Sequence, residues 1–231
     1  MPDDIAGMMR DIRLEVQLTK SWIGKEHLDA RVLAAMEKVP RHEFVPQELD
    51  YLAYSNGPLA IGHGQTISQP YIVALMTDLL RPQAEDVVLE VGTGSGYQAA
   101  VLSLLVKQVY SIEIVAALAQ DAATRLRSLG YSNVSVRGGD GYRGWPEHAP
   151  FDAIIVTAAA PTIPPPLLEQ LKPGGRMVIP VGAPYDRQIL TVIDKSERGD
   201  VTQQTILPVA FVPLTGKHGK EFDSGSDDGR L

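Results

Sequence analysis

Three glycines at alternate positions, Gly92, Gly94 and Gly96, mark the part of this chain best suited to ligand binding. The run Glu90-Val91-Gly92-Thr93-Gly94-Ser95-Gly96 follows a predicted strand and precedes a predicted helix. Glycines there let the backbone approach a ligand and adopt positive φ angles, and a helix N-terminus offers free N–H groups. The loop alone is also compatible with a plain strand-to-helix turn. Tyr97 stands where a dinucleotide fingerprint needs glycine or alanine, and the Gly-Lys-Ser/Thr of a phosphate P-loop is absent.

Acidic residues accompany this loop, each close to the end of a predicted strand. Glu90 precedes the loop, where a carboxylate could order it and meet a cationic ligand such as the amino-acid end of S-adenosylmethionine. Glu113 ends the next strand and is placed to accept both hydroxyls of an unphosphorylated ribose. Asp140, after the third strand, could accept a hydrogen bond from an adenine amino group, although a turn aspartate is the alternative.

Together these residues favour a nucleoside-bearing cofactor, which we predict to be S-adenosylmethionine. Open α/β sheets bind ligands at the carboxyl ends of their strands, where Thr157 would join the three acidic residues in one line of polar groups. The predicted cofactor-binding residues are Glu90, Gly92, Thr93, Gly94, Ser95, Gly96, Glu113, Asp140, Gly141 and Thr157.

The elements that must position these residues alternate between strands and helices. Predicted strands lie at 86–91, 108–113, 133–137, 151–157, 176–181, 188–193 and 201–211, and predicted helices at 5–20, 28–39, 71–80, 97–106, 115–129 and 163–171. Such alternation predicts a parallel sheet covered on both faces, and the last two strands, with no helix between them, predict an antiparallel pair at one edge. The expected fold is α/β: a Rossmann-like, seven-stranded, mostly parallel sheet of the class I methyltransferase type, with helices on both faces and an N-terminal helical segment.

Composition limits the function classes. The 231 residues carry a net charge of −7 and no cysteine, so disulfides, thiolate zinc sites and cysteine nucleophiles are excluded. An acidic balance disfavours nucleic acid as the main partner, and no histidine pair has metal-ligand spacing, so we predict no metal. No apolar run approaches the ~18 residues that span a bilayer, and the acidic start Met1–Asp4 is unlike a secretory signal. We therefore predict a cytoplasmic protein without membrane contact, and a monomer.

We expect one domain over residues 1–222, with a helical, substrate-side segment at 1–80, a cofactor-binding α/β core at 81–216, and a disordered tail at 223–231. The stretch from Pro46 to Pro70 contains three glycines between polar residues and has no clear helical period. We interpret it as a long irregular segment, and segments of this length are often functional.

Several runs resemble the protein-L-isoaspartate (D-aspartate) O-methyltransferase family. The specific ones are Gly64-Gln65-Thr66-Ile67-Ser68-Gln69-Pro70-Tyr71 and Phe211-Val212-Pro213-Leu214-Thr215-Gly216. The glycine loop, Gly139-Asp140-Gly141, Ala149-Pro150-Phe151-Asp152 and Leu171-Lys172-Pro173-Gly174-Gly175 also match, and the resemblance covers about residues 10 to 216. The glycine loop is shared with most methyltransferases and is not specific.

The resemblance implies a protein-repair enzyme, whose partners are damaged proteins and peptides containing L-isoaspartyl residues. Such an enzyme methylates the free α-carboxylate of the isoaspartyl residue with S-adenosylmethionine, and the methyl ester then cyclises to a succinimide. By position, Ser68 matches the active-site serine of the family. Predicted substrate contacts are Ile61, His63, Gln65, Thr66, Ile67, Val212 and Leu214. A loop-stabilising role is the alternative for His63 and Gln65, as core filling is for residues 212–214.

The chemistry asks little of the protein beyond positioning. A carboxylate nucleophile is already ionised at neutral pH, so methyl transfer from a sulfonium needs no strong general base, and orientation can contribute ~7–11 kcal/mol. Ser68 could donate a hydrogen bond that orients the carboxylate. Because it precedes Pro70 and a predicted helix, the alternative is a helix N-cap. A repair enzyme should bind peptide backbone in extended form, and the segment from Pro58 to Ser68 would suit this.

The sequence leaves three alternative functions open. One is a methyltransferase acting on a small molecule or RNA, which the Gly64–Tyr71 run and the acidic balance disfavour. Another is a non-catalytic S-adenosylmethionine-binding module, against which an intact Ser68 and loop argue. The third, a nicotinamide dehydrogenase, is disfavoured by Tyr97 in the fingerprint.

Overall fold

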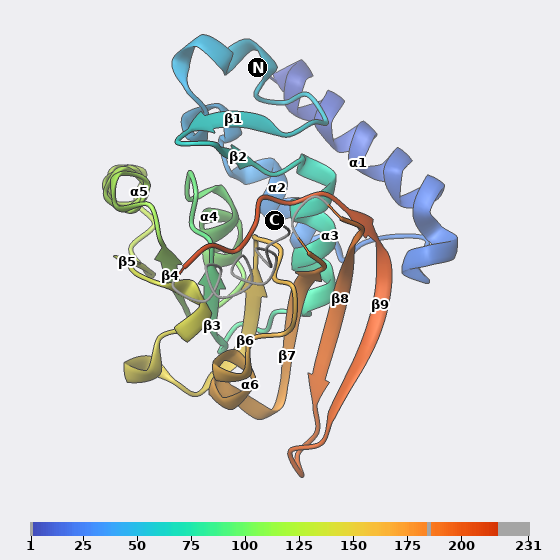
Figure 1. Ribbon diagram of the computed structural model, residues 1–231. Coiled ribbons are helices and arrows are strands. Elements are labelled where there is room, and N and C mark those ends of the chain that lie inside the picture. The colour runs from blue at the N-terminus through green and yellow to red at the C-terminus, as the bar shows by residue number, and fades with distance from the viewer. Residues whose placement is uncertain (1, 184–185, 217–231) are drawn as a thin grey trace, which may run out of the picture.

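Seven strands form one sheet in the order β5-β4-β3-β6-β7-β8-β9 (Figure 1). The computed structural model describes residues 2–183 and 186–216, so the predicted tail at 223–231 lies outside the described residues. The strands are β3 (Val87–Val91), β4 (Gln108–Glu113), β5 (Val134–Gly138), β6 (Phe151–Val156), β7 (Leu171–Val181), β8 (Gln188–Lys195) and β9 (Val201–Val209). Strands β3 to β7 pair in parallel, whereas β7–β8 and β8–β9 are antiparallel. The predicted, mostly parallel sheet with an antiparallel edge is confirmed.

Helices cover both faces of this sheet, as predicted. They are α1 (Pro2–Ile23), α2 (Ala30–Lys38), α3 (Pro70–Leu80), α4 (Tyr97–Ser103), α5 (Ala116–Ser128) and α6 (Pro165–Gln170). Alternate strand residues face opposite sides: Val88 packs in the cluster that contains residues of α1 to α5, whereas Leu89 and Val91 pack in the cluster that contains Leu167 of α6. The N-terminal helices therefore share one hydrophobic core with the sheet.

The predicted helix at 163–171 is shorter than expected. Helix α6 begins at Pro165 and ends at Gln170, and Leu171 already pairs with Phe151 as the first residue of β7. Residue 163 precedes Pro164, and a residue before proline is disfavoured in the helical region. Strand pairing then extends β7 back through the turn that was expected at Lys172–Gly175.

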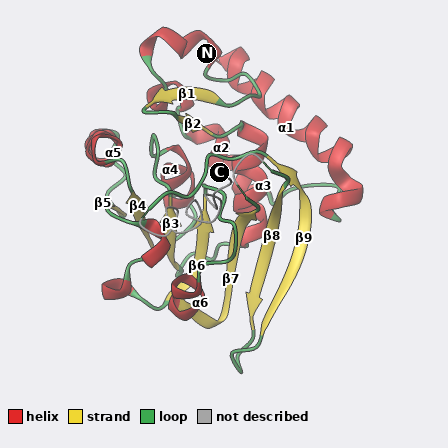
Figure 2. Cartoon of the chain, in the orientation of Figure 1, coloured by secondary structure: helices red, strands yellow, loops and turns green. Residues whose placement is uncertain are grey.

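The expectation that residues 46–70 lack regular structure was wrong. This segment contains the 3-10 helix η2 (Gln47–Leu52) and an antiparallel hairpin of β1 (Leu59–Gly62) and β2 (Gln65–Ile67). His63 and Gly64 form its two-residue turn, with φ angles of 53° and 70°, which is the backbone that the tight hairpin turn requires. The strands are too short to show a clear period in the sequence. Figure 2 shows the hairpin beyond the carboxyl ends of the parallel strands.

The N-terminal helix α1 extends beyond the predicted 5–20 at both ends. Its predicted inner face, with Met9, Ile12 and Val16, is buried. Three further 3-10 helices are η1 (Arg41–Phe44), η3 (Gly141–Arg143) and η4 (Pro146–His148). Within residues 2–183 and 186–216, no helix is both long and apolar enough to cross a membrane.

Candidate active site

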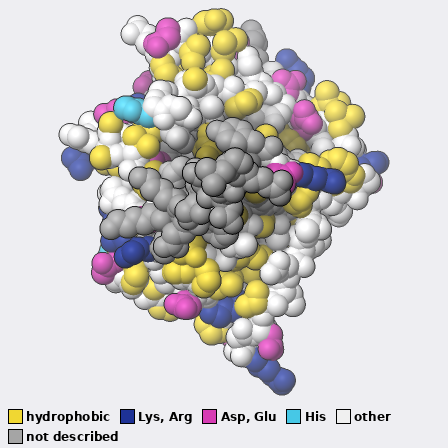
Figure 3. All heavy atoms as spheres, viewed as in Figure 1, with side chains coloured by type: hydrophobic (Ala, Val, Ile, Leu, Met, Phe, Trp, Pro, Cys, Tyr) yellow, Lys and Arg dark blue, Asp and Glu magenta, His cyan; other side chains and the backbone are white. Residues whose placement is uncertain are grey.

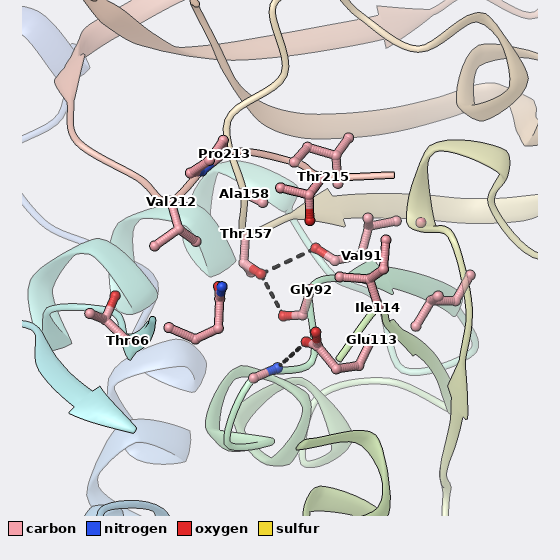
Figure 4. Close-up of a pocket in the computed structure, with 15 residues that line it drawn as sticks. Thr66, Val91, Gly92, Glu113, Ile114, Thr157, Ala158, Val212, Pro213 and Thr215 are labelled. Carbon is pink, nitrogen blue, oxygen red and sulfur yellow. Dashed lines mark hydrogen bonds between the residues drawn. The ribbon is translucent and has the colours of Figure 1, made fainter. Parts of the chain in front are cut away.

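A cavity of about 500 Å³, partly open to solvent, lies at the carboxyl ends of the parallel strands. Figure 4 shows side chains from the strand ends, the hairpin and the segment after β9 converging on it. Its lining residues are Gln65, Thr66, Val91, Gly92, Gly94, Ile112, Glu113, Ile114, Gly141, Thr157, Ala158, Val212, Pro213, Leu214 and Thr215. The tertiary structure thus brings together segments that are up to 150 residues apart, from Gln65 to Thr215.

The glycine loop folds as the alternate glycines require. Gly92, Gly94 and Gly96 have φ angles of 98°, 51° and 91°, which L side chains rarely adopt. A Cβ on Gly92 would lie 2.4 Å from Oγ1 of Thr157, and that hydroxyl donates to the Gly92 carbonyl over 2.5 Å (Figure 4). Thr157 therefore braces the loop from the end of β6. Gly92 and Gly94 line the cavity, whereas Gly96 does not.

Glu113 holds the same loop from β4. Its Oε2 accepts the N–H of Gly94 over 2.8 Å, and its Oε1 accepts the N–H of Val115 over 2.9 Å. The side chain is nearly buried but lines the cavity. Because each carboxylate oxygen has a second lone pair, Glu113 can still accept hydrogen bonds from a ligand diol.

Glu90 lies behind the loop and not in the cavity wall. It is fully buried opposite Ser111 of β4, whose Oγ donates to its Oε2 over 2.5 Å. The Ser111 hydroxyl also lies 2.5 Å from Oγ1 of Thr93, so a chain of buried polar groups joins Glu90 to the loop. Desolvation raises the pKa of Glu90 to about 8. The hydrogen bond from Ser111 lowers this pKa, and repulsion by Glu113 raises it further. Glu90 is therefore mostly neutral at pH 7 in the ligand-free protein, and direct contact with a cationic ligand stays a prediction.

The third strand end contributes Gly141 rather than Asp140 to the lining. A Cβ on Gly141 would lie 2.4 Å from Cγ1 of Val91, so only glycine fits between the cavity and β3. Asp140 precedes η3, and its Oδ1 accepts the N–H of Tyr142 over 3.1 Å, as a turn aspartate does. Its contact with an adenine amino group stays a prediction. Thr93 and Ser95 are buried and, like Asp140, are not lining residues.

A second, adjoining cavity of about 1020 Å³, also partly open to solvent, contains Ser68 in its wall. Its lining residues are Pro58, Thr66, Ser68, Gln69, Ile72, Thr157, Pro208, Val209, Ala210, Phe211 and Val212. Thr66, Thr157 and Val212 line both cavities, which therefore meet at these three residues.

Ser68 is not the cap of helix α3. The N-cap position is Gln69, and its side chain forms no capping hydrogen bond; the N–H of Tyr71 donates instead to Oδ1 of Asn56 over 3.3 Å. The Ser68 hydroxyl has no hydrogen-bond partner in the described part of the chain, so it is available to a ligand in the second cavity. The capping alternative for Ser68 was wrong.

The predicted substrate residues of the hairpin are dispersed. Gln65 lines the first cavity and Thr66 lines both. Ile61 approaches the glycine loop, with its Cδ1 3.4 Å from where a Cβ on Gly94 would lie. Ile67 is buried in the core, and His63 is exposed at the hairpin turn; neither lines a cavity. Contact of Ile67 or His63 with a substrate stays a prediction.

The segment after β9 crosses the carboxyl edge of the sheet and closes the first cavity (Figure 1). Ala159 holds it: its N–H donates to Val212 over 2.8 Å, and its carbonyl accepts from Leu214 over 2.7 Å. Val212 lines both cavities, but Leu214, which we expected beside a substrate, lines the first. Thr215 was not expected to line a cavity, although it stands in the run that carried the resemblance.

Apolar lining residues were also missed. Ile112 and Ile114 flank Glu113 in sequence and in the cavity, and their position beside the ribose-type carboxylate was the available signal. Among the described residues, no Lys, Arg or His lines this cavity. A carboxylate without a nearby cation disfavours a phosphate, whereas an apolar wall beside a diol acceptor suits an unphosphorylated nucleoside.

The sheet, the glycine loop and this cavity, whose wall has one carboxylate and no cation among the described residues, define a Rossmann-like protein of the class I methyltransferase type. The sequence matches the Protein-L-isoaspartate(D-aspartate) O-methyltransferase (PCMT) family over residues 17–219. A "Protein-L-isoaspartate O-methyltransferase 2" of Syntrophobacter fumaroxidans is 63% identical over 213 residues, covering 92% of this chain and 86% of the relative. Another of that name, from Polaromonas sp., is 62% identical over 210 residues, covering 91% of this chain and 100% of the relative. The chain therefore belongs to the protein-L-isoaspartate (D-aspartate) O-methyltransferase family.

Solved structures agree with this assignment. A protein-L-isoaspartate O-methyltransferase is similar with a TM-score of 0.78 at 27% identity, covering 93% of this chain and 68% of the other. A PCMT structure from Plasmodium falciparum, in complex with S-adenosyl-L-homocysteine, has a TM-score of 0.70 at 25% identity, covering 88% and 96%. The resemblance and the fold class expected from the sequence are both confirmed.

Proposed function

We propose that this protein transfers a methyl group from S-adenosylmethionine to the α-carboxylate of L-isoaspartyl residues in damaged proteins and peptides. The observation that carries this proposal is the meeting of two cavities at Thr66, Thr157 and Val212. One cavity has the lining of a nucleoside site, and the other presents the Ser68 hydroxyl, which has no hydrogen-bond partner among the described residues. A methyl donor in one cavity and a carboxylate acceptor in the other would therefore meet beside these three residues.

The first cavity fits S-adenosylmethionine, which supplies a sulfonium methyl group when bound. Glu113 would accept the ribose hydroxyls, and Ile112 and Ile114 would contact the adenine plane. Gly92 and Gly94 would let the backbone approach the remainder of the molecule. The absence of a lining cation among the described residues agrees with a ligand that carries no phosphate.

The second cavity would orient the carboxylate. The acceptor oxygen is already ionised, and neither cavity has a lining His or Lys in the described part of the chain; a general base is not needed. Ser68 would donate a hydrogen bond to one carboxylate oxygen and leave the other to form the new C–O bond, while the C–S electron pair stays with sulfur. A neutral hydroxyl holds the anion without removing its charge, so the oxygen stays nucleophilic. The methyl ester would then leave the enzyme, and attack of a backbone amide nitrogen on the ester carbon would give a succinimide and release methanol.

The substrate peptide would lie extended along Pro58, Thr66 and Ser68 and the segment at 208–212, all of which line the second cavity. Recognition of backbone rather than side chains would let one enzyme act on many damaged sequences. Strong dependence of activity on residues flanking the isoaspartate would count against this arrangement.

The deciding assay measures methyl transfer to matched peptides that differ only in carrying isoaspartate or aspartate at one position. We expect label in the isoaspartyl peptide alone. Label in neither peptide would overturn the proposed activity, and equal label in both would remove the repair function.

Ser68→Ala tests the orienting role. We expect a fall in kcat/KM of at least about tenfold, because one hydrogen bond to a charged group is worth ~1.5–3 kcal/mol. Ser128→Ala is the matched control, since Ser128 is exposed at the end of α5 and bonds only the Arg125 carbonyl among the described residues. A Ser68→Ala variant within about twofold of wild type would exclude the orienting role.

We further propose that residues 2–216 act as one domain, because one hydrophobic cluster joins the N-terminal helices to the sheet. On the face shown in Figure 3, the Lys and Arg side chains of the described residues lie at separate places and do not form the continuous basic stripe typical of nucleic-acid surfaces. A monomeric state and a cytoplasmic location stay predictions, to be tested by sedimentation and by cell fractionation.

A further inference from the structure

Arg41 is a fully buried cation at the start of η1. None of the residues that the structure describes forms an ion pair with it. Burial lowers the pKa of Arg41, but a guanidinium stays protonated in proteins. An unpaired buried charge opposes folding, so stability alone gives no reason for an arginine at this position.

Its guanidinium joins three segments that are far apart in sequence. Nε donates to the carbonyl of Ala53, after η2, over 2.8 Å. Nη2 donates over 2.7 Å to the carbonyl of Ser68, between β2 and α3. The guanidinium carbon lies 4.7 Å from the ring centroid of Tyr97, the first residue after the glycine loop. The backbone of the substrate-side serine is thereby fixed relative to the cofactor loop.

Tyr97 provides a rigid surface beneath the guanidinium. Its side chain is buried and packs against Phe44 edge to face, with ring centroids 5.5 Å apart and an interplanar angle of 67°. The large residue that departs from the dinucleotide fingerprint therefore has a structural use here, as the base on which Arg41 lies.

Arg41 and Tyr97 line neither cavity, so any effect of Arg41 on catalysis is indirect, through the segments that it holds. The third nitrogen, Nη1, is buried and has no hydrogen-bond partner in the described residues. The guanidinium therefore does not belong to a cluster of buried polar side chains. Its two hydrogen bonds go to the backbone carbonyls of Ala53 and of Ser68, and Ser68 lines the second cavity.

We propose that Arg41 is a positioning residue for methyl transfer, which fixes the Ser68 backbone against the helix that follows the glycine loop. The inference rests on the proposed function. In-line displacement depends on alignment, and a displacement of about 1 Å can cost about 100-fold in rate. A planar, forked guanidinium can make both bonds while lying on an aromatic ring, whereas a lysine ammonium cannot reproduce this geometry.

Arg41→Lys keeps the charge and removes the fork. We expect kcat for an isoaspartyl peptide, corrected for the folded fraction, to fall at least about tenfold, with KM changed less than about threefold. Binding of S-adenosylhomocysteine, measured by calorimetry, should stay within about twofold. Arg176→Lys is the control, because Arg176 also donates to a backbone carbonyl, that of Leu79, and lines neither cavity. It should lower the melting temperature without changing kcat.

Amide hydrogen exchange provides a readout that needs no activity. Residues 66–69 should exchange faster in Arg41→Lys than in wild type and in Arg176→Lys. Wild-type kcat, or unchanged exchange at 66–69, would overturn the inference, as would a parallel loss of S-adenosylhomocysteine affinity. If Arg41→Lys does not fold, Tyr97→Leu takes its place, because it removes the ring beneath the guanidinium and leaves both carbonyl acceptors. Tyr97→Leu should lower kcat per folded molecule, and an unchanged kcat would overturn the inference. A wild-type enzyme inactive on isoaspartyl peptides would overturn the proposed function instead, and the exchange data would still decide the role of Arg41.

Discussion

Replacing Glu90 with glutamine should stabilise the ligand-free protein at alkaline pH and change it little in acid. Glu90 is fully buried and keeps one carboxylate oxygen, Oε1, without a partner among the described residues. A glutamine has nearly the same shape as the protonated acid. Its amide oxygen can accept the Ser111 hydroxyl, and its amide nitrogen takes the place of an oxygen that already lacks a partner.

The size of the effect follows from the two pKa values. The pKa of Glu90 is about 8 in the folded protein against an ordinary value of 4.5. The unfolded chain releases this proton first, so stability is full below pH 4.5 and declines as the pH rises towards 8. At ~1.36 kcal/mol per pKa unit, the wild type loses about 1 kcal/mol by pH 5, about 3 by pH 7 and about 5 above pH 9. The glutamine variant does not lose this stability.

Denaturant unfolding between pH 5 and pH 9 measures this directly, as the difference in unfolding free energy between Glu90→Gln and wild type at each pH. The difference should rise by about 1.4 kcal/mol per pH unit up to pH 8. Glu169→Gln, at an exposed position, should show a difference below about 0.5 kcal/mol throughout. A flat difference for Glu90→Gln across the range would refute the conclusion that the interior behind the glycine loop holds a neutral acid.

Two further predictions concern the cofactor cavity. Glu113→Gln leaves one side-chain oxygen for two backbone N–H donors. Calorimetry should show S-adenosylhomocysteine binding about 10- to 100-fold more weakly, a loss of ~1.4 kcal/mol for each factor of ten. An unchanged Kd would contradict the role given to Glu113. Gly141→Ala places a methyl group 2.4 Å from Cγ1 of Val91, which should destabilise the protein by about 1–3 kcal/mol in denaturant unfolding. Gly139→Ala, whose nearest contact is 3.7 Å away, should be within about 0.5 kcal/mol of wild type, and equal losses in both variants would contradict this packing.

Elements with long, strongly patterned segments could be predicted from the sequence. Strand β6 is apolar at every position except Asp152 because both sheet faces are covered, and α1 shows its buried stripe at helical spacing. The hairpin could not be predicted in this way, because its strands have only four and three residues and its register depends on a turn with two positive φ angles. The end of α6 was also missed, because pairing of Leu171 with β6 overrides the local helical preference.

The sequence alone determined the glycine loop, the order of strand and helix, and the line of polar residues at strand ends, because these depend on local backbone geometry and periodicity. Only the tertiary structure decided which of those residues face a ligand. The register that sets Glu90 opposite Ser111 places this acid in the interior, where desolvation keeps it neutral. The packing of Arg41 on Tyr97 and against the Ser68 carbonyl joins the two halves of the site. Side-chain burial and long-range contacts of this kind arise from chain segments that meet only in the folded state, so no local pattern encodes them.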